Sequence, residues 1–345
     1  MKLDVVVKRP LRVLVPVHED LMPPKSIEGL SDEDIQPWKT EYDVITTLSN
    51  MGHEVLPVGV YSDLGVIRRA IEQFKPHIAF NLLEEFHGDS LYDQHMVSYL
   101  ELQKIPYTGC NPRGLTLGHD KALSKKILAY HRIPVPNFAV FPVNRKVRRP
   151  RRLEFPLFVK SLIEEGSVGI SRASIVHDDA KLVERVSFIH RQTNGTAIAE
   201  QYIEGREIYV SVLGNNQLRT LTPWELFISN LPEGAPMIAT DRVKWDYQYQ
   251  KKAGVVTKAA KLTSEQHNEL ARLSKRIYRS LYLSGYARLD FRLDTQGRFF
   301  LLEANPNPNL SFGEDFAEAA EHGGLSYDAL LQKIITLGMS YQKWA

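Results

Sequence analysis

The chain has 345 residues with a single cysteine, and its 43 Lys and Arg residues nearly balance 41 Asp and Glu residues. An apolar fraction of 43% and a charged fraction of 24% exclude the disordered and low-complexity classes. The lone Cys110 excludes an internal disulfide and a cysteine-rich zinc module. The small net charge argues against a dedicated nucleic-acid binder, and no apolar run is long enough to predict a membrane span. We therefore expect a cytoplasmic protein with neither kind of partner.

The first third of the chain alternates apolar strand patterns with amphipathic helix patterns. The strand patterns cover residues 11–17, 53–60 and 77–82, and the helix patterns cover residues 40–50, 66–74 and 93–103. This alternation predicts a parallel sheet with helices on both faces. Ligands bind beyond the carboxyl ends of the strands in such sheets, so the polar residues that follow the first and third strands, Glu19 and Glu84 among them, are candidates for substrate contact.

The middle of the chain predicts smaller units. In order, they are a helix at 120–131, a strand at 155–161, a glycine turn at 166–169, a helix capped by Asp178, and a hairpin of 196–202 with 207–214 around Glu204-Gly205. Residues 224–254 show no regular pattern and are expected to form a long functional loop. Residues 263–266 form a capping box that opens another helix. The basic stretch 145–152 is interpreted as a solvated loop, with a patch for an acidic partner as the alternative.

A last hairpin is predicted at residues 285–304, with its turn at 294–297. Pairing Leu293 with Arg298 places Arg288 opposite Glu303. The other face is apolar and is expected to pack on the core through Ala287, Leu289, Phe291, Leu293, Phe300, Leu302 and Ala304.

The polar face of this hairpin carries a set of metal-binding groups. Asp290 and Asn305 lie on the same face as Arg288 and Glu303, by the two-residue period of a strand. Oxygen ligands of this kind suit Mg²⁺ or Mn²⁺ that is shared with a substrate phosphate. An ordinary cross-strand ion pair on the surface is the alternative.

Lys160 is unusual because it stands within an otherwise apolar strand, PLFVKSL. Soon after it, Gly166 and Gly169 allow backbone amides to approach an anion, and Ser167 adds a hydroxyl. This arrangement predicts an anion site, although an edge-strand lysine that reaches solvent would give the same pattern.

Five motifs together resemble the ATP-grasp superfamily, and its D-alanine–D-alanine ligase-like branch most of all. They are Asp120-Lys121, Val159-Lys160 with the following glycine turn, AEQYIEGREIYVSVLG, ARLDFRL and LLEANPNP, and the resemblance spans about residues 77–335. It implies a fold of class α/β with a pre-ATP-grasp domain at 1–112. Two α+β subdomains, at 113–198 and 199–345, would then hold ATP between them.

The resemblance also implies roles for single residues. Lys121, Lys160 and Ser167 match the phosphate-binding groups, and Lys244 matches the loop lysine that reaches the γ-phosphate. Glu200 matches the acid that accepts the adenine amino group. The other matches are Tyr202 and Ile203 at the adenine edge, Glu207 at the ribose, Arg288 at the acyl-phosphate and tetrahedral intermediates, and Asp290, Glu303 and Asn305 at two Mg²⁺ or Mn²⁺ ions.

The sequence departs from this branch on the substrate side. It has VPVHEDLMPP after the first strand, NLLEEFHGDSLYDQH after the third, and Trp245 in place of a tyrosine. We therefore expect an ADP-forming carboxylate–amine ligase that acts on amino acids or small peptides other than D-alanine, with Glu19 or Glu84 near an ammonium group. A true D-alanine–D-alanine ligase is the alternative, and a non-catalytic protein that binds nucleotide or an acidic partner is the alternative of another class. The branch suggests a homodimer.

Overall fold

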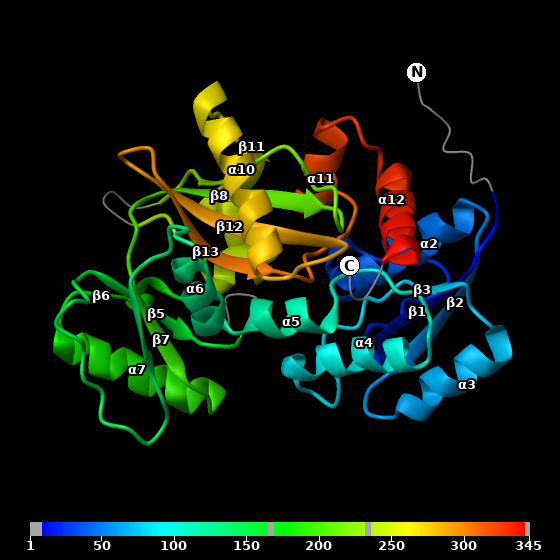
Figure 1. Ribbon diagram of the computed structural model, residues 1–345, viewed down its shortest axis with the longest axis horizontal. Coiled ribbons are helices and arrows are strands. Elements are labelled where there is room, and N and C mark those ends of the chain that lie inside the picture. The colour runs from blue at the N-terminus through cyan, green and yellow to red at the C-terminus, as the bar shows by residue number, and fades with distance from the viewer. Residues whose placement is uncertain (1–8, 165–168, 232–235, 342–345) are drawn as a thin grey trace.

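The computed structural model of the chain describes residues 9–164, 169–231 and 236–341. These residues form three sheets, which Figure 1 shows with helices packed around and between them. The first sheet has the order β2-β1-β3 and is parallel throughout. Its strands are β1 (Arg12–His18), β2 (Glu54–Val60) and β3 (Ile78–Ala79).

Helices cover both faces of the first sheet, as predicted. Alternate residues of β1 point to opposite faces, so Leu14 packs in one core cluster and Val15 in another. The helices α3 (Leu64–Phe74) and α4 (Asp93–Leu102) contribute to the first cluster, and α2 (Lys39–Asn50) and α12 (Tyr327–Ser340) contribute to the second.

The central sheet has the order β4-β7-β5-β6, and its paired strands are antiparallel. The strands are β4 (Phe138–Phe141), β5 (Leu157–Ser161), β6 (Ile175–Val176) and β7 (Ala197–Gln201). The helix α7 (Asp179–Thr193) packs on this sheet, and the side chain of Asp178 caps it as predicted. Before the sheet come α6 (Lys121–Tyr130), which was predicted, and α5 (Pro112–His119), which was not. A glycine-containing segment of eight residues gives little helical signal, although Asn111 caps it.

The predicted hairpin of residues 196–202 with 207–214 is wrong. Strand β7 pairs with β4 and β5, whereas β8 (Gly205–Leu213) belongs to the third sheet. The segment between them is therefore a connection from one sheet to the next (Figure 1). Gly205 has a positive φ of 148°, and a Cβ at this position would overlap the backbone of Leu293, so the crossing requires glycine.

The third sheet has the order β11-β10-β8-β12-β13, and β9 adds to β8. Residues 224–254, which were expected to lack regular structure, include a strand and two helices. Thr263 and Gln266 form the predicted capping box of α10. The remaining elements are β9 (Arg219–Thr220), β10 (Trp224–Ile228), β11 (Val255–Ala259), β12 (Tyr286–Asp294), β13 (Phe299–Asn305), α1 (Asp32–Ile35), α8 (Asp241–Trp245), α9 (Tyr247–Ala253), α10 (Ser264–Ser280) and α11 (Asp315–His322).

The β12–β13 hairpin forms where it was predicted but in a different register. Asp290 lies opposite Glu303 and Arg288 opposite Asn305, and a bulge then shifts the pairing so that Phe291 meets Leu301. Leu302 is the extra residue of this bulge. Beyond it Phe299 and Leu301 enter the core in place of the predicted Phe300 and Leu302.

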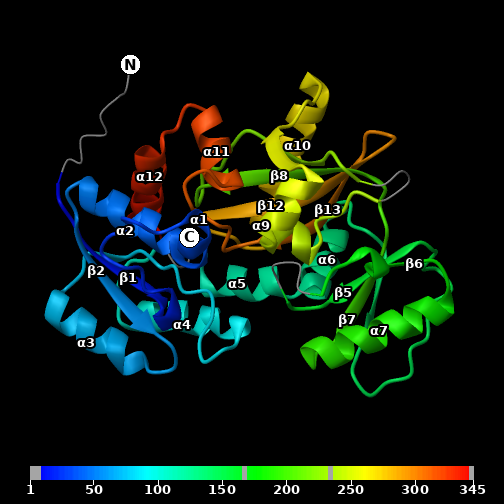
Figure 2. The same ribbon diagram turned by 180° about the vertical axis from the view of Figure 1, so that it is seen from behind.

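The last helix, α12, returns to the first sheet and lies beside α2 in both Figure 1 and Figure 2. The predicted boundary at residue 198 falls inside β7. We therefore propose that the central unit ends at Gln201 and that α12 belongs with residues 1–112. Within the described residues, no helix is both long and apolar enough to cross a bilayer.

We predict that Gly338→Ala will destabilise the protein. Alanine normally stabilises a helix relative to glycine by about 1 kcal/mol. At Gly338, however, a Cβ would overlap the carbonyl oxygen of Tyr107 and lie 2.9 Å from Ile78 Cδ1, so overpacking should lower the free energy of unfolding by about 1–3 kcal/mol. Denaturant unfolding measures this change, with Thr336→Ala at an exposed position of the same helix as the control. Unchanged or increased stability of Gly338→Ala would contradict this packing.

Candidate active site

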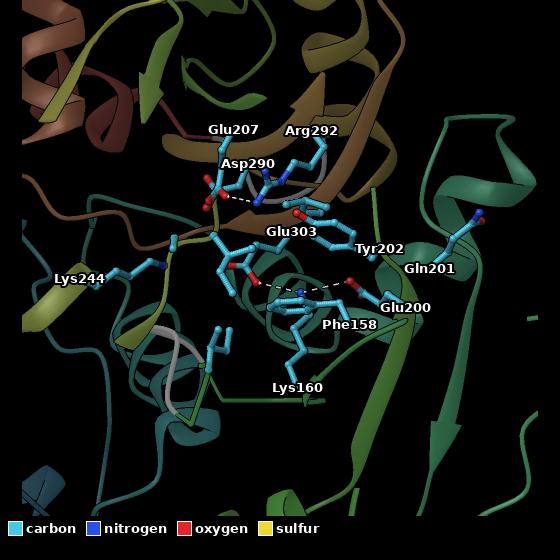
Figure 3. Close-up of a pocket in the computed structure, with 14 residues that line it drawn as sticks. Phe158, Lys160, Glu200, Gln201, Tyr202, Glu207, Lys244, Asp290, Arg292 and Glu303 are labelled. Carbon is cyan, nitrogen blue, oxygen red and sulfur yellow. Dashed lines mark hydrogen bonds and ion pairs between the residues drawn. The ribbon is translucent and has the colours of Figure 1, made fainter. Parts of the chain in front are cut away.

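A cavity lies between the central and the third sheet, and Figure 3 shows side chains from both sheets that point into it. Its walls combine apolar and charged groups. The described residues that line it are Phe158, Lys160, Ile170, Glu200, Gln201, Tyr202, Glu207, Ile238, Ala239, Lys244, Asp290, Arg292, Leu302 and Glu303.

Lys160 stands between two carboxylates at the floor of the cavity (Figure 3). Its Nζ lies 3.4 Å from Glu200 Oε2 and 3.7 Å from Glu303 Oε2. Burial alone would lower the pKa of Lys160, but these carboxylates raise it above its ordinary value. Burial would likewise raise the pKa of the Glu303 carboxyl, but Lys160 and Lys121 hold it well below its usual range. Lys160 and Glu303 are therefore both charged at neutral pH.

Glu200 has a second cation, Lys125, which the sequence analysis missed. The Lys125 Nζ lies 2.8 Å from Glu200 Oε1 and also donates a hydrogen bond to the carbonyl oxygen of Leu302. Lys125 is one of the most buried charged groups, with 1% of its surface exposed. It stands four residues after Lys121 on α6, so helical spacing would have placed both lysines on one side of the helix.

Arg292 and Glu207 form a buried ion pair at the opposite wall. The Arg292 guanidinium donates to Glu207 Oε2 at 2.8 Å and to the carbonyl oxygens of Gly205 and Met237, each at 2.8 Å. Glu207 also accepts a hydrogen bond from the Tyr209 hydroxyl, at 2.9 Å. Arg292 was missed as well, although the two-residue period from Asp290 would have indicated it.

The Arg288 guanidinium donates two hydrogen bonds to the Asp290 carboxylate, from Nε at 2.7 Å and from Nη2 at 3.0 Å. The Asn305 side chain accepts a hydrogen bond from the backbone of Asn307 at 2.8 Å, which fixes its oxygen near the end of β13. The hairpin therefore brings together the four polar groups that the sequence indicated, despite the changed register.

Most of the predicted nucleotide, catalytic and metal residues line this cavity. Seven of them line the cavity: Lys160, Glu200, Tyr202, Glu207, Lys244, Asp290 and Glu303. Lys121, Arg288 and Asn305 are not among the lining residues but are near them. Lys121 is 4.0 Å from Glu303, Arg288 donates to Asp290, and Asn305 lies two residues after Glu303 on β13. Ile203 follows Tyr202 on the connection between the sheets, and Ser167 lies outside the described residues.

The two predicted substrate residues are not among the described residues that line the cavity. Glu19 follows β1 and Glu84 follows β3, and both are exposed. Next to them in the sequence, His18 and Glu85 are in contact, with His18 Nε2 3.2 Å from the Glu85 carboxylate. Their positions agree with the expected edge of the first sheet.

Apolar residues of the cavity wall escaped the sequence analysis for different reasons. Phe158 lies two residues before Lys160 and shares its face, so strand periodicity would have found it. Leu302 faces the cavity only because of the bulge, and Ile238 and Ala239 lie where the sequence has no regular pattern.

At least one residue of the basic stretch 145–152 makes contacts that hold it to the rest of the protein. Arg149 pairs with Asp179 at 2.9 Å, donates to the Leu153 carbonyl oxygen at 2.6 Å and stacks on Phe155. This arrangement agrees with the loop interpretation for Arg149.

The sequence and the fold both match known proteins. Residues 127–336 match the family described as D-ala D-ala ligase C-terminus. An uncharacterized protein, y4sG, of Sinorhizobium fredii is 32% identical over 312 residues, which cover 87% of this chain and 88% of that protein. A D-alanine–D-alanine ligase of Syntrophotalea carbinolica is 30% identical and covers 91% of this chain and 95% of its own length. The crystal structure of a D-alanine–D-alanine ligase from Bacillus anthracis complexed with ATP has a TM-score of 0.73, at 22% identity, and covers 95% of this chain and 97% of its own.

We predict that Arg292→Met will destabilise the fold more than an exposed substitution on the same hairpin. Removing Arg292 leaves the Glu207 carboxylate buried without its cation, which should cost about 3–5 kcal/mol of unfolding free energy. Arg298→Met is the control, because that side chain is 62% exposed in its pair with Asp294 and should cost less than about 1 kcal/mol. Adding Glu207→Gln to Arg292→Met should restore part of the loss. Equal denaturation midpoints for the two single variants would refute the buried pair.

Proposed function

Because the chain belongs to the D-alanine–D-alanine ligase family of ATP-grasp enzymes, we propose that it uses ATP to activate a substrate carboxylate as an acyl phosphate. An amine then attacks this intermediate, and an amide forms with release of ADP and phosphate. The observation that carries the proposal is the cavity between the two sheets, where Lys160 stands between Glu200 and Glu303.

The cavity has apolar and charged lining residues, which suit the base and the phosphates of ATP respectively. Phe158, Ile170 and Leu302 offer apolar surface for a flat base, next to the backbone at Tyr202 and Ile203. Glu200 would accept the adenine amino group, and Glu207 would bind the ribose. Lys121, Lys160 and Lys244 would then face the phosphates, where their charges stabilise the transferred group.

The donor set of the hairpin fits Mg²⁺ or Mn²⁺. Asp290 and Glu303 lie opposite each other in register, and Asn305 adds an amide oxygen close by. These residues would hold the ions, which supply charge neutralisation and alignment of the phosphate oxygens when bound. Asp290 accepts hydrogen bonds from Arg288 on both its oxygens, so Arg288 would lie next to the metal site and face the developing oxyanion.

D-alanine is the first candidate for both substrates. The comparisons favour a D-alanine–D-alanine ligase over the wider interpretation of the sequence, because enzymes of that name align over most of the chain. The departures at Glu19, Glu84 and Trp245 still set this chain apart on the substrate side. The cytoplasmic location and the homodimer remain predictions.

The substrate assignment predicts a direct result. Incubation with ATP, Mg²⁺ and D-alanine should give D-alanyl-D-alanine, detected by mass spectrometry, with one ADP released for each dipeptide. ADP release that requires another acid or amine, with no dipeptide from D-alanine, would favour the wider interpretation. No ADP release from any mixture would favour a nucleotide-binding protein without turnover.

Glu303→Gln should lower the rate of ADP formation by about 100-fold or more, since one carboxylate ligand is lost while the side-chain volume is kept. Glu204→Gln is the control, because Glu204 is exposed on the connection between the sheets and outside the cavity. The measurement is ADP release at saturating Mg²⁺. Near-normal turnover of Glu303→Gln would remove Glu303 from the metal site.

A further inference from the structure

The pair of lysines on Glu200 raises a question of charge balance. The residue Glu200 is 2% exposed, and its two carboxylate oxygens each lie beside one ammonium group, from Lys125 and from Lys160. The proposed function requires Lys160 to bind phosphate. If Lys160 moves toward a phosphate, Glu200 keeps only its other cation, and a buried carboxylate without any cation is costly.

We propose that Lys125 is a positioning residue. It stabilises the negative charge of the Glu200 carboxylate and thereby leaves Lys160 free to bind the nucleotide phosphates. This inference rests on the proposed function. Lys125 is not among the described residues that line the cavity, so it acts through Glu200 and not by contact with the nucleotide.

The geometry makes the two lysines unequal. Lys125 is the closer one, at 2.8 Å from Glu200 compared with 3.4 Å for Lys160. Lys125 also has a second fixed partner, the Leu302 carbonyl oxygen, whereas the other carboxylate near Lys160 is Glu303 at 3.7 Å, a proposed metal ligand. A metal ion on Glu303 would compete with Lys160 for that carboxylate, whereas the two contacts of Lys125 are with Glu200 and Leu302.

The contact with Leu302 gives Lys125 a second effect. Leu302 is the extra residue of the β13 bulge, next to Glu303. A single ammonium group therefore joins α6, the central sheet through Glu200 and the third sheet through Leu302. Lys125 therefore supplies a cation to Glu200 and at the same time holds the backbone beside Glu303 in place.

The test is calorimetry of ADP with Mg²⁺ and of adenosine, on the full chain. Lys125→Met should weaken ADP binding by about 10- to 100-fold, or about 1.4–2.8 kcal/mol, because Lys160 must then stay with Glu200. Adenosine has no phosphate, so its affinity should change less than about threefold. The control is Lys126→Met, an exposed neighbour on the same helix, which should leave both affinities unchanged.

A double-mutant cycle separates this role from a structural one. In a Glu200→Gln background there is no carboxylate charge to hold, so adding Lys125→Met should change ADP affinity less than about threefold. This comparison also serves if Lys125→Met alone does not fold. A tenfold loss in that background, or an equal loss of adenosine and ADP binding in Lys125→Met, would overturn the proposal and leave a packing role.

Failure of the proposed function and failure of the Lys125 role give different binding results. If the unmodified chain binds neither ADP nor adenosine, the proposed function fails, and the role of Lys125 fails with it. If it binds ADP and Lys125→Met binds ADP equally well, only the role of Lys125 is overturned.

Discussion

The cavity depends on one constraint, which is that the buried carboxylate of Glu200 must be kept charged in a dry environment. Burial would raise the pKa of Glu200, but Lys125 and Lys160 lower it below its ordinary value. These lysines come from α6 and β5, while the carboxylate comes from β7, so the ion pairs bind the helix to the central sheet. The same lysines reach Leu302 and Glu303 on β13, so they also hold the third sheet against the central one.

This constraint explains which parts of the site could be predicted from the sequence. Buried charged residues must be paired, so a lysine such as Lys160 within an apolar strand marks a candidate site, which the glycine turn after it supports. The alternating pattern on β12 and β13 likewise indicates the polar face that carries Asp290 and Glu303. Side-chain period is a local property, and local properties can be read from sequence.

Pairing between strands is not local, and there the sequence-based prediction failed. A turn at Glu204-Gly205 fits a hairpin, but the same residues serve equally well where the chain leaves one sheet for another. The bulge at Leu302 is also invisible, because a single extra residue changes the register without changing the pattern on either strand. The bulge has a large effect on the site. It turns the Leu302 side chain toward the cavity, and it leaves the Leu302 carbonyl oxygen free to accept a hydrogen bond from Lys125.

The polar contacts after β13 show how the first sheet is joined to the proposed metal site. Asn305 is bonded to the backbone of Asn307, whose side chain donates to the fully buried Asp93 of α4 at 2.9 Å. Asp93 in turn lies 2.8 Å from His119 of α5. The chain of contacts runs from the proposed metal ligand to α4, which covers the first sheet, and on to α5.

Further along, the same segment is tied to α2. Thr40 contacts Asn309 at 3.0 Å and Ser311 at 2.7 Å, and Asp43 accepts a hydrogen bond from the backbone of Phe312 at 2.9 Å. A network of hydrogen bonds at several points makes such a segment rigid. Glu19 and Glu84, which depart from the family on the substrate side, follow strands of the first sheet, and the third sheet carries the proposed metal ligands Asp290, Glu303 and Asn305. Residues 305–312 follow directly on β13 and are bonded to α2 and α4, so they fix the helices of the first sheet in place beside the proposed metal site.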